Sequence, residues 1–391
     1  MKKDTKLVTT GRDPAAQSGI VNPPVYHAST VLFPSVAALR EAMKTPFEGV
    51  YYGRIGTPTS AAFEEALAEL EGGYRAVSVP SGLAAITTAL IATLKAGDHL
   101  LMVDNTYNPT RKFCEGPLKD LGIETTFYDP LVGGKIAELF RPETKVVYLE
   151  SPGSLTFEIQ DTPAITAVAK ERGITTIFDN TWATPLFYQP VKHGVDYVVQ
   201  AATKYITGHS DTMLGAVVAR DEARFQQLKT ITVALGLCAG VEELFLGLRG
   251  LRSLGARLNR HQETGLKLAR WLQQRPEVTR VIHPALADDP NHELWKRDFS
   301  GANGLFAFIL KPVPEPAVEA MLDGMKYFGM GFSWGGYESL ILPVSPWISR
   351  SATEWAEKAP YIRIHAGLED PDDLIADLEA GFERLTAATR K

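Results

Sequence analysis

The chain has 391 residues, of which 45% are hydrophobic and 22% charged, and its formal net charge is -6. This length allows two or three domains with a core that needs no disulfides or metal ions. The negative charge and the scattered Lys and Arg residues argue against a nucleic-acid-binding protein, and the two cysteines, Cys114 and Cys238, indicate neither a disulfide framework nor a metal site.

Targeting and membrane signals do not stand out in the sequence. The start, "MKKDTKLVTTGRDP", has two lysines but no apolar region behind them. No segment approaches the roughly 18 unbroken apolar residues that suggest a membrane span. We therefore expect a cytoplasmic protein with no membrane partner.

Taken in chain order, the first predicted region is an arm over residues 1–56. It is rich in Pro, Gly and turn residues and shows little periodicity. Such a segment commonly packs on something else, often another subunit.

Residues 57–250 are predicted to form an α/β domain, because short apolar runs alternate here with helical patterns. Seven runs are candidate strands of one mainly parallel sheet: 75–81, 99–104, 123–129, 144–151, 175–181, 196–203 and 214–219. Between the first two runs, Ile86, Leu90 and Leu94 repeat at helical spacing, and Gly97 is a candidate left-handed cap.

The pattern changes after residue 240 to one long helical stretch over 241–278. The remainder reads as a smaller α+β domain, predicted over 251–391, with a strand at 304–310 and helices at 314–325 and 371–385.

Three places at predicted strand ends carry chemistry. Ser81 and Gly82 lie between a strand and a helix, where backbone N–H groups can bind an anion, although Ser81 also suits an ordinary helix cap. Asp179 closes a β-branched strand, where it either faces a ligand or bonds its own turn. Lys204 follows the run "DYVVQAAT", where it either reaches solvent or has an amine whose pKa is lowered by desolvation.

Together these places indicate one cofactor. An anion site, a carboxylate and an amine at the same edge of a sheet suit pyridoxal 5'-phosphate (PLP), which needs a lysine for its aldehyde, an acid for its ring nitrogen and donors for its phosphate.

At this point the sequence resembles the PLP-dependent enzymes of cysteine and methionine metabolism, the trans-sulfuration enzymes. The resemblance rests on "DYVVQAATKYITGHSD" and extends over nearly the whole chain, through "NPPVYHASTVLF", "YYGRIGTPT", "ALAELEGGYRAVSVPSGLAAI", "YLESPGS", "FDNTWAT", "SWGGYESL" and "YIRIHAGLEDPDDLIADLEAGF". It implies the fold of the aspartate aminotransferase type (fold type I), with a seven-stranded sheet and a smaller C-terminal domain.

The resemblance implies roles for residues that would hold the cofactor. Lys204 matches the lysine that forms the Schiff base and later moves the proton of the substrate Cα, and Asp179 matches the partner of the pyridinium nitrogen. Gly82 and Leu83 would donate backbone N–H groups to the phosphate, and Thr203 would add its hydroxyl.

The resemblance also implies residues that would line the substrate site. One is Tyr107, which matches the tyrosine that stacks on the cofactor ring and also faces the substrate; without the resemblance it reads as a turn aromatic. Arg363 matches the arginine that binds the substrate α-carboxylate, a task that suits a planar bidentate donor. Ser333 and Trp334, in "SWGG", match positions that line the substrate pocket.

The arm gains an explanation from the same source. Tyr52 and Arg54 match residues that reach the phosphate of the neighbouring subunit. The resemblance thus implies active sites shared across a dimer, and a homotetramer built from two dimers.

Within the family, the chain is similar to the bacterial cystathionine β-lyases. Many relatives with γ-synthase or γ-lyase activity carry asparagine in "ESPxNP" and "RxGNPT", where this chain has Gly153, Ser154 and Thr57. They also tend to have an aliphatic residue in place of Trp334. We therefore expect a carbon-sulfur β-lyase that converts cystathionine to homocysteine, pyruvate and ammonia in methionine biosynthesis, with cystine and cysteine S-conjugates as further substrates.

Three alternatives stay open. The first is γ-chemistry on the same scaffold, as in cystathionine γ-lyase, cystathionine γ-synthase or methionine γ-lyase. The second is a nicotinamide-dependent dehydrogenase, which would need G-x-G-x-x-G after the first strand, where this chain has "PSGLAA". The third is a binding protein without activity on the same fold.

Overall fold

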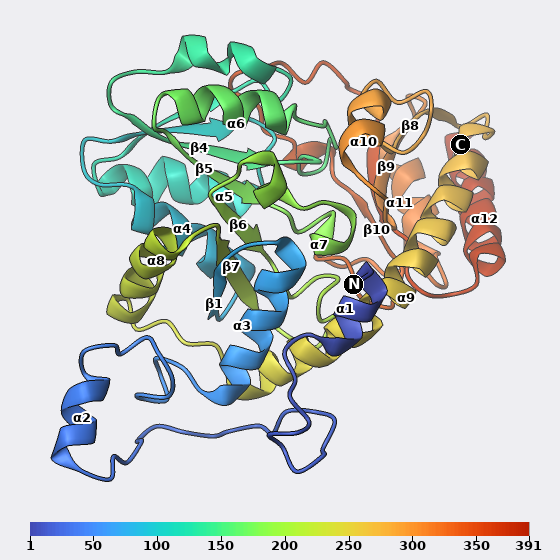
Figure 1. Ribbon diagram of the computed structural model, residues 1–391. Coiled ribbons are helices and arrows are strands. Elements are labelled where there is room, and N and C mark those ends of the chain that lie inside the picture. The colour runs from blue at the N-terminus through green and yellow to red at the C-terminus, as the bar shows by residue number, and fades with distance from the viewer. Residues whose placement is uncertain (391) are drawn as a thin grey trace.

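The computed structural model describes residues 1–390, and a seven-stranded sheet lies at the centre of its larger part (Figure 1). The strand order is β1-β7-β6-β5-β4-β2-β3. The strands are β1 (Arg75–Val79), β2 (His99–Val103), β3 (Glu124–Tyr128), β4 (Thr144–Glu150), β5 (Thr175–Asp179), β6 (Tyr197–Gln200) and β7 (Gly215–Ala219). All seven runs predicted from the sequence form strands, and the predicted fold class is confirmed.

β7 differs from the other strands in direction. It pairs antiparallel with β1 and with β6, whereas the pairs among β2 to β6 are parallel. The chain passes from β6 to β7 through residues 201–214 without a helix. Antiparallel neighbours can be joined in this way, whereas parallel strands need a crossover.

Helices cover both faces of this sheet. Because successive side chains of a strand point to opposite faces, each face packs a separate hydrophobic core against its own helices. Val77 belongs to a core that includes residues of α4 (Gly82–Thr93), η1 (Cys114–Leu118) and α8 (Glu222–Ala234), with α5 (Asn108–Phe113) at its margin. Ala76 belongs to the opposite core, which includes residues of α3 (Pro58–Glu71), η2 (Gly133–Leu139), α6 (Thr162–Glu171), α7 (Thr184–Phe187) and α9 (Val241–Gln273). The short helix η3 (Pro190–His193) precedes β6.

The predicted start of α4 is confirmed and its predicted end is not. Ser81 caps the helix, since its side chain accepts a hydrogen bond from the N–H of Ala84. The helix ends at Thr93, and its C-cap Leu94 has an extended backbone. Gly97 does adopt a left-handed conformation, with φ +90°, but in the turn before β2.

A second sheet, fully antiparallel, forms the C-terminal part. Its order is β10-β11-β9-β8, from β8 (Val278–Ile282), β9 (Leu305–Leu310), β10 (Leu340–Pro343) and β11 (Tyr361–His365). The other elements there are α10 (His292–Asp298), α11 (Glu315–Asp323), η4 (Ser345–Trp347) and α12 (Pro371–Thr389). α9 joins the two parts as one helix of 33 residues (Figure 1). Its Leu248 lies in the core that contains Ala76, and its Leu268 lies in a third core, which includes residues of the second sheet, α11 and α12. The predicted domain boundary at residue 250 thus falls inside α9.

The N-terminal segment contains two short helices. α1 (Lys3–Thr9) lies against the body of the molecule, because Leu7 is buried and its carbonyl accepts a hydrogen bond of 2.8 Å from Arg252 Nη1. α2 (Val36–Ala42) buries no residue, and the irregular chain around it extends away from the body (Figure 1). No helix within residues 1–390 is long and apolar enough to cross a membrane.

Candidate active site

Three of the predicted site residues lie at one edge of the large sheet. Asp179 is the last residue of β5, Ser81 follows β1 by two positions, and Lys204 follows β6 by four. β1 and β6 both run antiparallel to β7, so β1 points the same way as β6 and β5. The carboxyl ends of these strands therefore share an edge, which is where open α/β sheets bind ligands.

Lys204 is half-buried, and its amine is held by contacts with the C-terminal part. Its Nζ donates a hydrogen bond of 2.6 Å to Ser333 Oγ and lies 5.5 Å from the centre of the Trp334 ring. Burial, followed by the positive charge of Arg363, lowers the pKa of Lys204 to about 8. With this pKa about a tenth of the amine is neutral at pH 7, far more than for an ordinary lysine, and the neutral form is the one that a nucleophile or a base requires.

Asp179 has a carboxylate neighbour that the sequence analysis missed. β4 and β5 pair in register, so Glu150 and Asp179 lie side by side on one face of the sheet. Tyr148 reaches Asp179 Oδ2 at 3.5 Å from the same face, and the N–H of Thr181 donates to Asp179 Oδ1 at 2.9 Å. Burial raises the pKa of Asp179, and a cation bound beside it would favour the ionised form.

Glu150, the neighbour of Asp179, is hydrogen-bonded to the segment that carries Tyr107. Its Oε2 accepts hydrogen bonds from the N–H of Tyr107 at 2.8 Å and from Thr106 Oγ1 at 3.1 Å. Burial and the charge of Asp179 raise the pKa of Glu150 well above its usual range. The signal was present in the sequence, because Glu150 closes its strand just as Asp179 does.

The start of α4 offers an anion site. Ser81 uses its side chain on the N–H of Ala84, which leaves the N–H groups of Gly82 and Leu83 in the first turn without helical partners. A Cβ at Gly82 would lie 2.4 Å from the Cβ of Ala201, just before the Lys204 segment. Only glycine lets the helix end come this close, which suits a phosphate held by backbone N–H groups.

Thr203 lies at the predicted phosphate site with its hydroxyl already engaged. Its Oγ1 donates to the carbonyl of Leu214 at 3.1 Å and accepts from the N–H of Leu214 at 2.9 Å. It would have to release Leu214 to donate to a phosphate.

Three of the four residues predicted to bind substrate, Arg363, Ser333 and Trp334, belong to the C-terminal part, whereas Tyr107 belongs to the large sheet's part. Arg363 lies on β11, a central strand of its sheet, and its Nη2 donates to the carbonyl of Ser333 at 3.0 Å. Burial lowers the pKa of Arg363 to about 10. Arg363, Ser333, Trp334 and Lys204 are thus brought together, although the sequence separates Lys204 from Ser333 by 129 positions.

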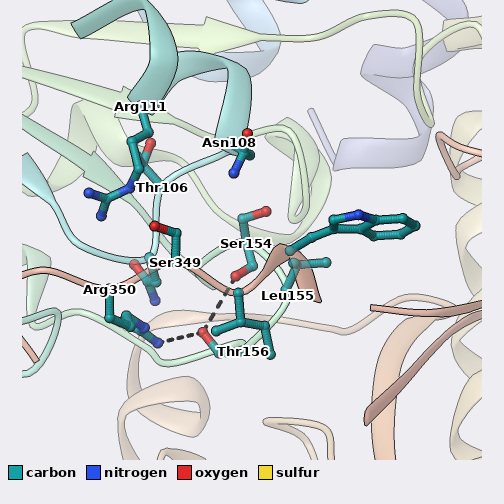
Figure 2. Close-up of a pocket in the computed structure, with 11 residues that line it drawn as sticks. Thr106, Asn108, Arg111, Ser154, Leu155, Thr156, Ser349 and Arg350 are labelled. Carbon is teal, nitrogen blue, oxygen red and sulfur yellow. Dashed lines mark hydrogen bonds between the residues drawn. The ribbon is translucent and has the colours of Figure 1, made fainter. Parts of the chain in front are cut away.

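Tyr107 lies at the N-terminus of α5, with 45% of its surface exposed. Desolvation, followed by the charges of Glu150 and Asp179, raises the pKa of its phenol. A pocket flanks it, lined by residues 105, 106, 108 and 111, by 154–156 and by 347–350 (Figure 2). Two buried polar atoms of the pocket residues, Asn105 Oδ1 and Arg350 Nη1, have no hydrogen-bond partner within residues 1–390.

Tyr52 and Arg54 make their contacts elsewhere. Tyr52 is 39% exposed and its hydroxyl lies 3.3 Å from Ser29 Oγ. Arg54 Nη1 donates to the carbonyl of Val233 on α8 at 2.7 Å. Both residues belong to the extended N-terminal segment, and within this chain they do not join the group around Lys204.

The donor set around the strand ends fits PLP. Lys204 supplies a partly neutral amine, Asp179 a buried carboxylate, and the start of α4 two N–H groups beside a glycine that admits close approach. These are the three functions by which proteins bind this cofactor. Residues 1–390 contain no group of three His, Cys, Asp or Glu side chains placed to hold a metal ion.

Comparisons with known proteins agree with this reading. The family model described as "Cys/Met metabolism PLP-dependent enzyme" matches residues 4–383. Cystathionine beta-lyase MetC of Escherichia coli (strain K12) is 42% identical over 98% of this chain and 99% of its own. The L-alanine/L-glutamate racemase of Wolbachia pipientis wMel is also 42% identical, over 100% of this chain and 99% of its own.

A solved structure, the cystathionine gamma synthase of Xanthomonas oryzae pv. oryzae in complex with aminoacrylate and cysteine, superimposes with a TM-score of 0.91 at 34% identity, covering 99% of both chains. Sequence, fold and the strand-end residues thus lead to one conclusion: this chain belongs to the family of PLP-dependent enzymes of cysteine and methionine metabolism.

Proposed function

We propose that the chain is a carbon-sulfur β-lyase that converts cystathionine and water to homocysteine, pyruvate and ammonia. The observation that carries the proposal is the contact between the Lys204 amine and Ser333, whose carbonyl also binds Arg363. If Lys204 acts as the base, this contact supports the proposal, because it would bring the base close to the cation that would bind an amino-acid carboxylate. The likeness to the β-lyase of Escherichia coli supports the choice of reaction.

Each side chain has a task in this proposal. Bound PLP would supply the electron sink that makes the substrate Cα acidic. Asp179 would keep the ring nitrogen of the cofactor protonated, and the first turn of α4 would bind the phosphate. Arg363 would fix the α-carboxylate, so that Lys204 can remove the Cα proton.

The surroundings of Lys204 favour β-elimination over γ-chemistry. γ-Elimination needs a second deprotonation at Cβ, so the base must move between two carbons. Here the amine is fixed on one side by Ser333 Oγ at 2.6 Å and faces the Trp334 ring at 5.5 Å. A base held in this way is suited to one proton, at Cα.

The test is the identity of the keto acid formed from cystathionine by the purified PLP-loaded enzyme. We expect pyruvate together with homocysteine, and loss of both in Lys204→Ala. Formation of 2-oxobutyrate and cysteine instead would assign the γ-lyase reaction. Racemisation of L-alanine or L-glutamate without either keto acid would assign the activity named for the Wolbachia relative.

We further propose that the enzyme is a cytoplasmic homotetramer with active sites shared across each dimer. The N-terminal segment supports this, because it exposes apolar side chains that a monomer would leave in water: Leu32 at 88%, Val36 at 63% and Ile20 at 60%. Large exposed apolar groups of this kind mark association surfaces. Tyr52 and Arg54 in the same segment would then approach the cofactor phosphate of the neighbouring subunit.

A further inference from the structure

β11 presents two side chains to the loop 331–336, which carries Ser333 and Trp334. Arg363 and His365 alternate on this strand and therefore point to the same face. Arg363 Nη2 donates to the carbonyl of Ser333 at 3.0 Å. His365 Nε2 lies 3.1 Å from the N–H of Gly335 and 3.2 Å from the carbonyl of Gly336. Two residues of one strand thus hold two consecutive parts of one loop.

The His365 ring is fixed and neutral. It is completely buried, and burial lowers its pKa well below the usual range. Its ring packs against Tyr205 at 5.9 Å and His261 at 5.2 Å between ring centres, and His261 is itself held by Ala366, 2.8 Å from Nδ1 to the carbonyl. A neutral imidazole can offer Nε2 as the acceptor for the N–H of Gly335.

The loop lies directly against the backbone of the Lys204 segment at Gly335. This glycine has φ +87°, and a Cβ there would lie 2.9 Å from the carbonyl carbon of Lys204 and 2.8 Å from the nitrogen of Tyr205. A displacement of Gly335 therefore moves Ser333 and Trp334 with respect to the Lys204 amine.

We propose that His365 is a positioning residue for the substrate site: by accepting the N–H of Gly335 it keeps Ser333 and Trp334 against the amine of Lys204. It acts through the loop and does not itself contact the reacting atoms. The kinetic part of this inference rests on the proposed lyase function, whereas the effect on the Lys204 amine does not.

Three variants separate positioning from stability. His365→Phe keeps a ring of similar size and removes the hydrogen bond to the N–H of Gly335. His365→Gln removes the ring but restores an acceptor at similar reach for the N–H of Gly335. His283→Phe is the matched control, because His283 is also completely buried, lies in the turn after β8 and accepts the N–H of Ala285 at 3.1 Å. If His365→Phe does not fold, His365→Asn, whose side chain is too short to reach Gly335, replaces it.

Each variant is measured in two ways: kcat/KM on the PLP-loaded enzyme, and the pH dependence of PLP capture on the PLP-free protein. In His365→Phe we expect kcat/KM for cystathionine to fall on the order of 100-fold, as for a displaced catalytic group, and His365→Gln to be at least about 10-fold better. In the PLP-free proteins, the pH midpoint for PLP capture by Lys204 should rise from about 8 toward the ordinary lysine value in His365→Phe alone. His283→Phe should lose thermal stability without either change.

The inference is overturned if His365→Phe keeps both the wild-type kcat/KM and the wild-type midpoint. It is equally overturned if His365→Gln is as impaired as His365→Phe, or if His283→Phe changes the same two quantities. Absence of lyase activity in the wild type, with the midpoint shifted as expected in His365→Phe, would refute the proposed function and leave the positioning role intact.

Discussion

Substitution of Gly82 by alanine gives a sharp test of the proposed phosphate site. The new Cβ would lie 2.4 Å from the Cβ of Ala201, whereas carbon atoms of this kind normally stay about 3.5 Å apart. The helix start must therefore shift by about 1 Å, which turns a hydrogen bond of about 2.9 Å to a phosphate oxygen into a gap of about 3.9 Å. Such a bond to a charged group contributes about 1.5–3 kcal/mol.

The expected result is a loss of PLP affinity of about 10-fold to 150-fold in Gly82→Ala, because each 1.4 kcal/mol changes a dissociation constant tenfold. The assay is titration of the PLP-free enzyme with PLP, followed by absorbance. Gly116→Ala is the control, since a Cβ at Gly116 meets no atom within 4 Å. Wild-type affinity in Gly82→Ala, with the protein folded, would show that the start of α4 does not bind the phosphate.

Three further predictions concern Lys204, the buried Glu71 at the end of α3, and Arg54. PLP capture by the PLP-free enzyme should accelerate as the pH rises through about 8, since the Lys204 amine must lose its proton; a midpoint near 10.5 would contradict its burial. Burial raises the pKa of Glu71 to about 8, so the folded state holds a proton that the unfolded state releases near pH 4.5, and stability should fall as pH rises from 4.5 through 8. The free energy of unfolding should fall by at most about 1.4 kcal/mol per pH unit, as measured by urea unfolding at several pH values. This pH dependence should be absent in Glu71→Gln. Equal slopes in the two proteins would refute the assignment to Glu71. Finally, subunits with Lys204→Ala mixed with subunits with Arg54→Ala should regain about a quarter of wild-type activity, because a mixed dimer has one site free of both changes; no recovery after confirmed exchange of subunits would argue against shared sites.

Much of the large sheet could be predicted because its signals are local. β-Branched runs separated by helical patterns identified all seven strands, and the turn chemistry around Ser81 identified the start of α4. The end of α4 was predicted wrongly from the sequence. Gly97 resembles a cap, but the chain leaves the helix three residues earlier, at Leu94. Helix ends depend on neighbouring packing, which local patterns do not record.

The sequence by itself determined the strands, the placement of Asp179 and Lys204 at or just beyond strand ends, and membership of a PLP-dependent family, because these follow from residue order over short distances. Only the tertiary structure decided that β7 is antiparallel to its neighbours, that Glu150 lies beside Asp179, and that Ser333 contacts the amine of Lys204, 129 positions away. The same holds for His365, which reads as one more strand residue until the loop 331–336 packs on it. Such contacts depend on how distant segments pack together, and the spacing of residues along the chain does not indicate which distant segments meet.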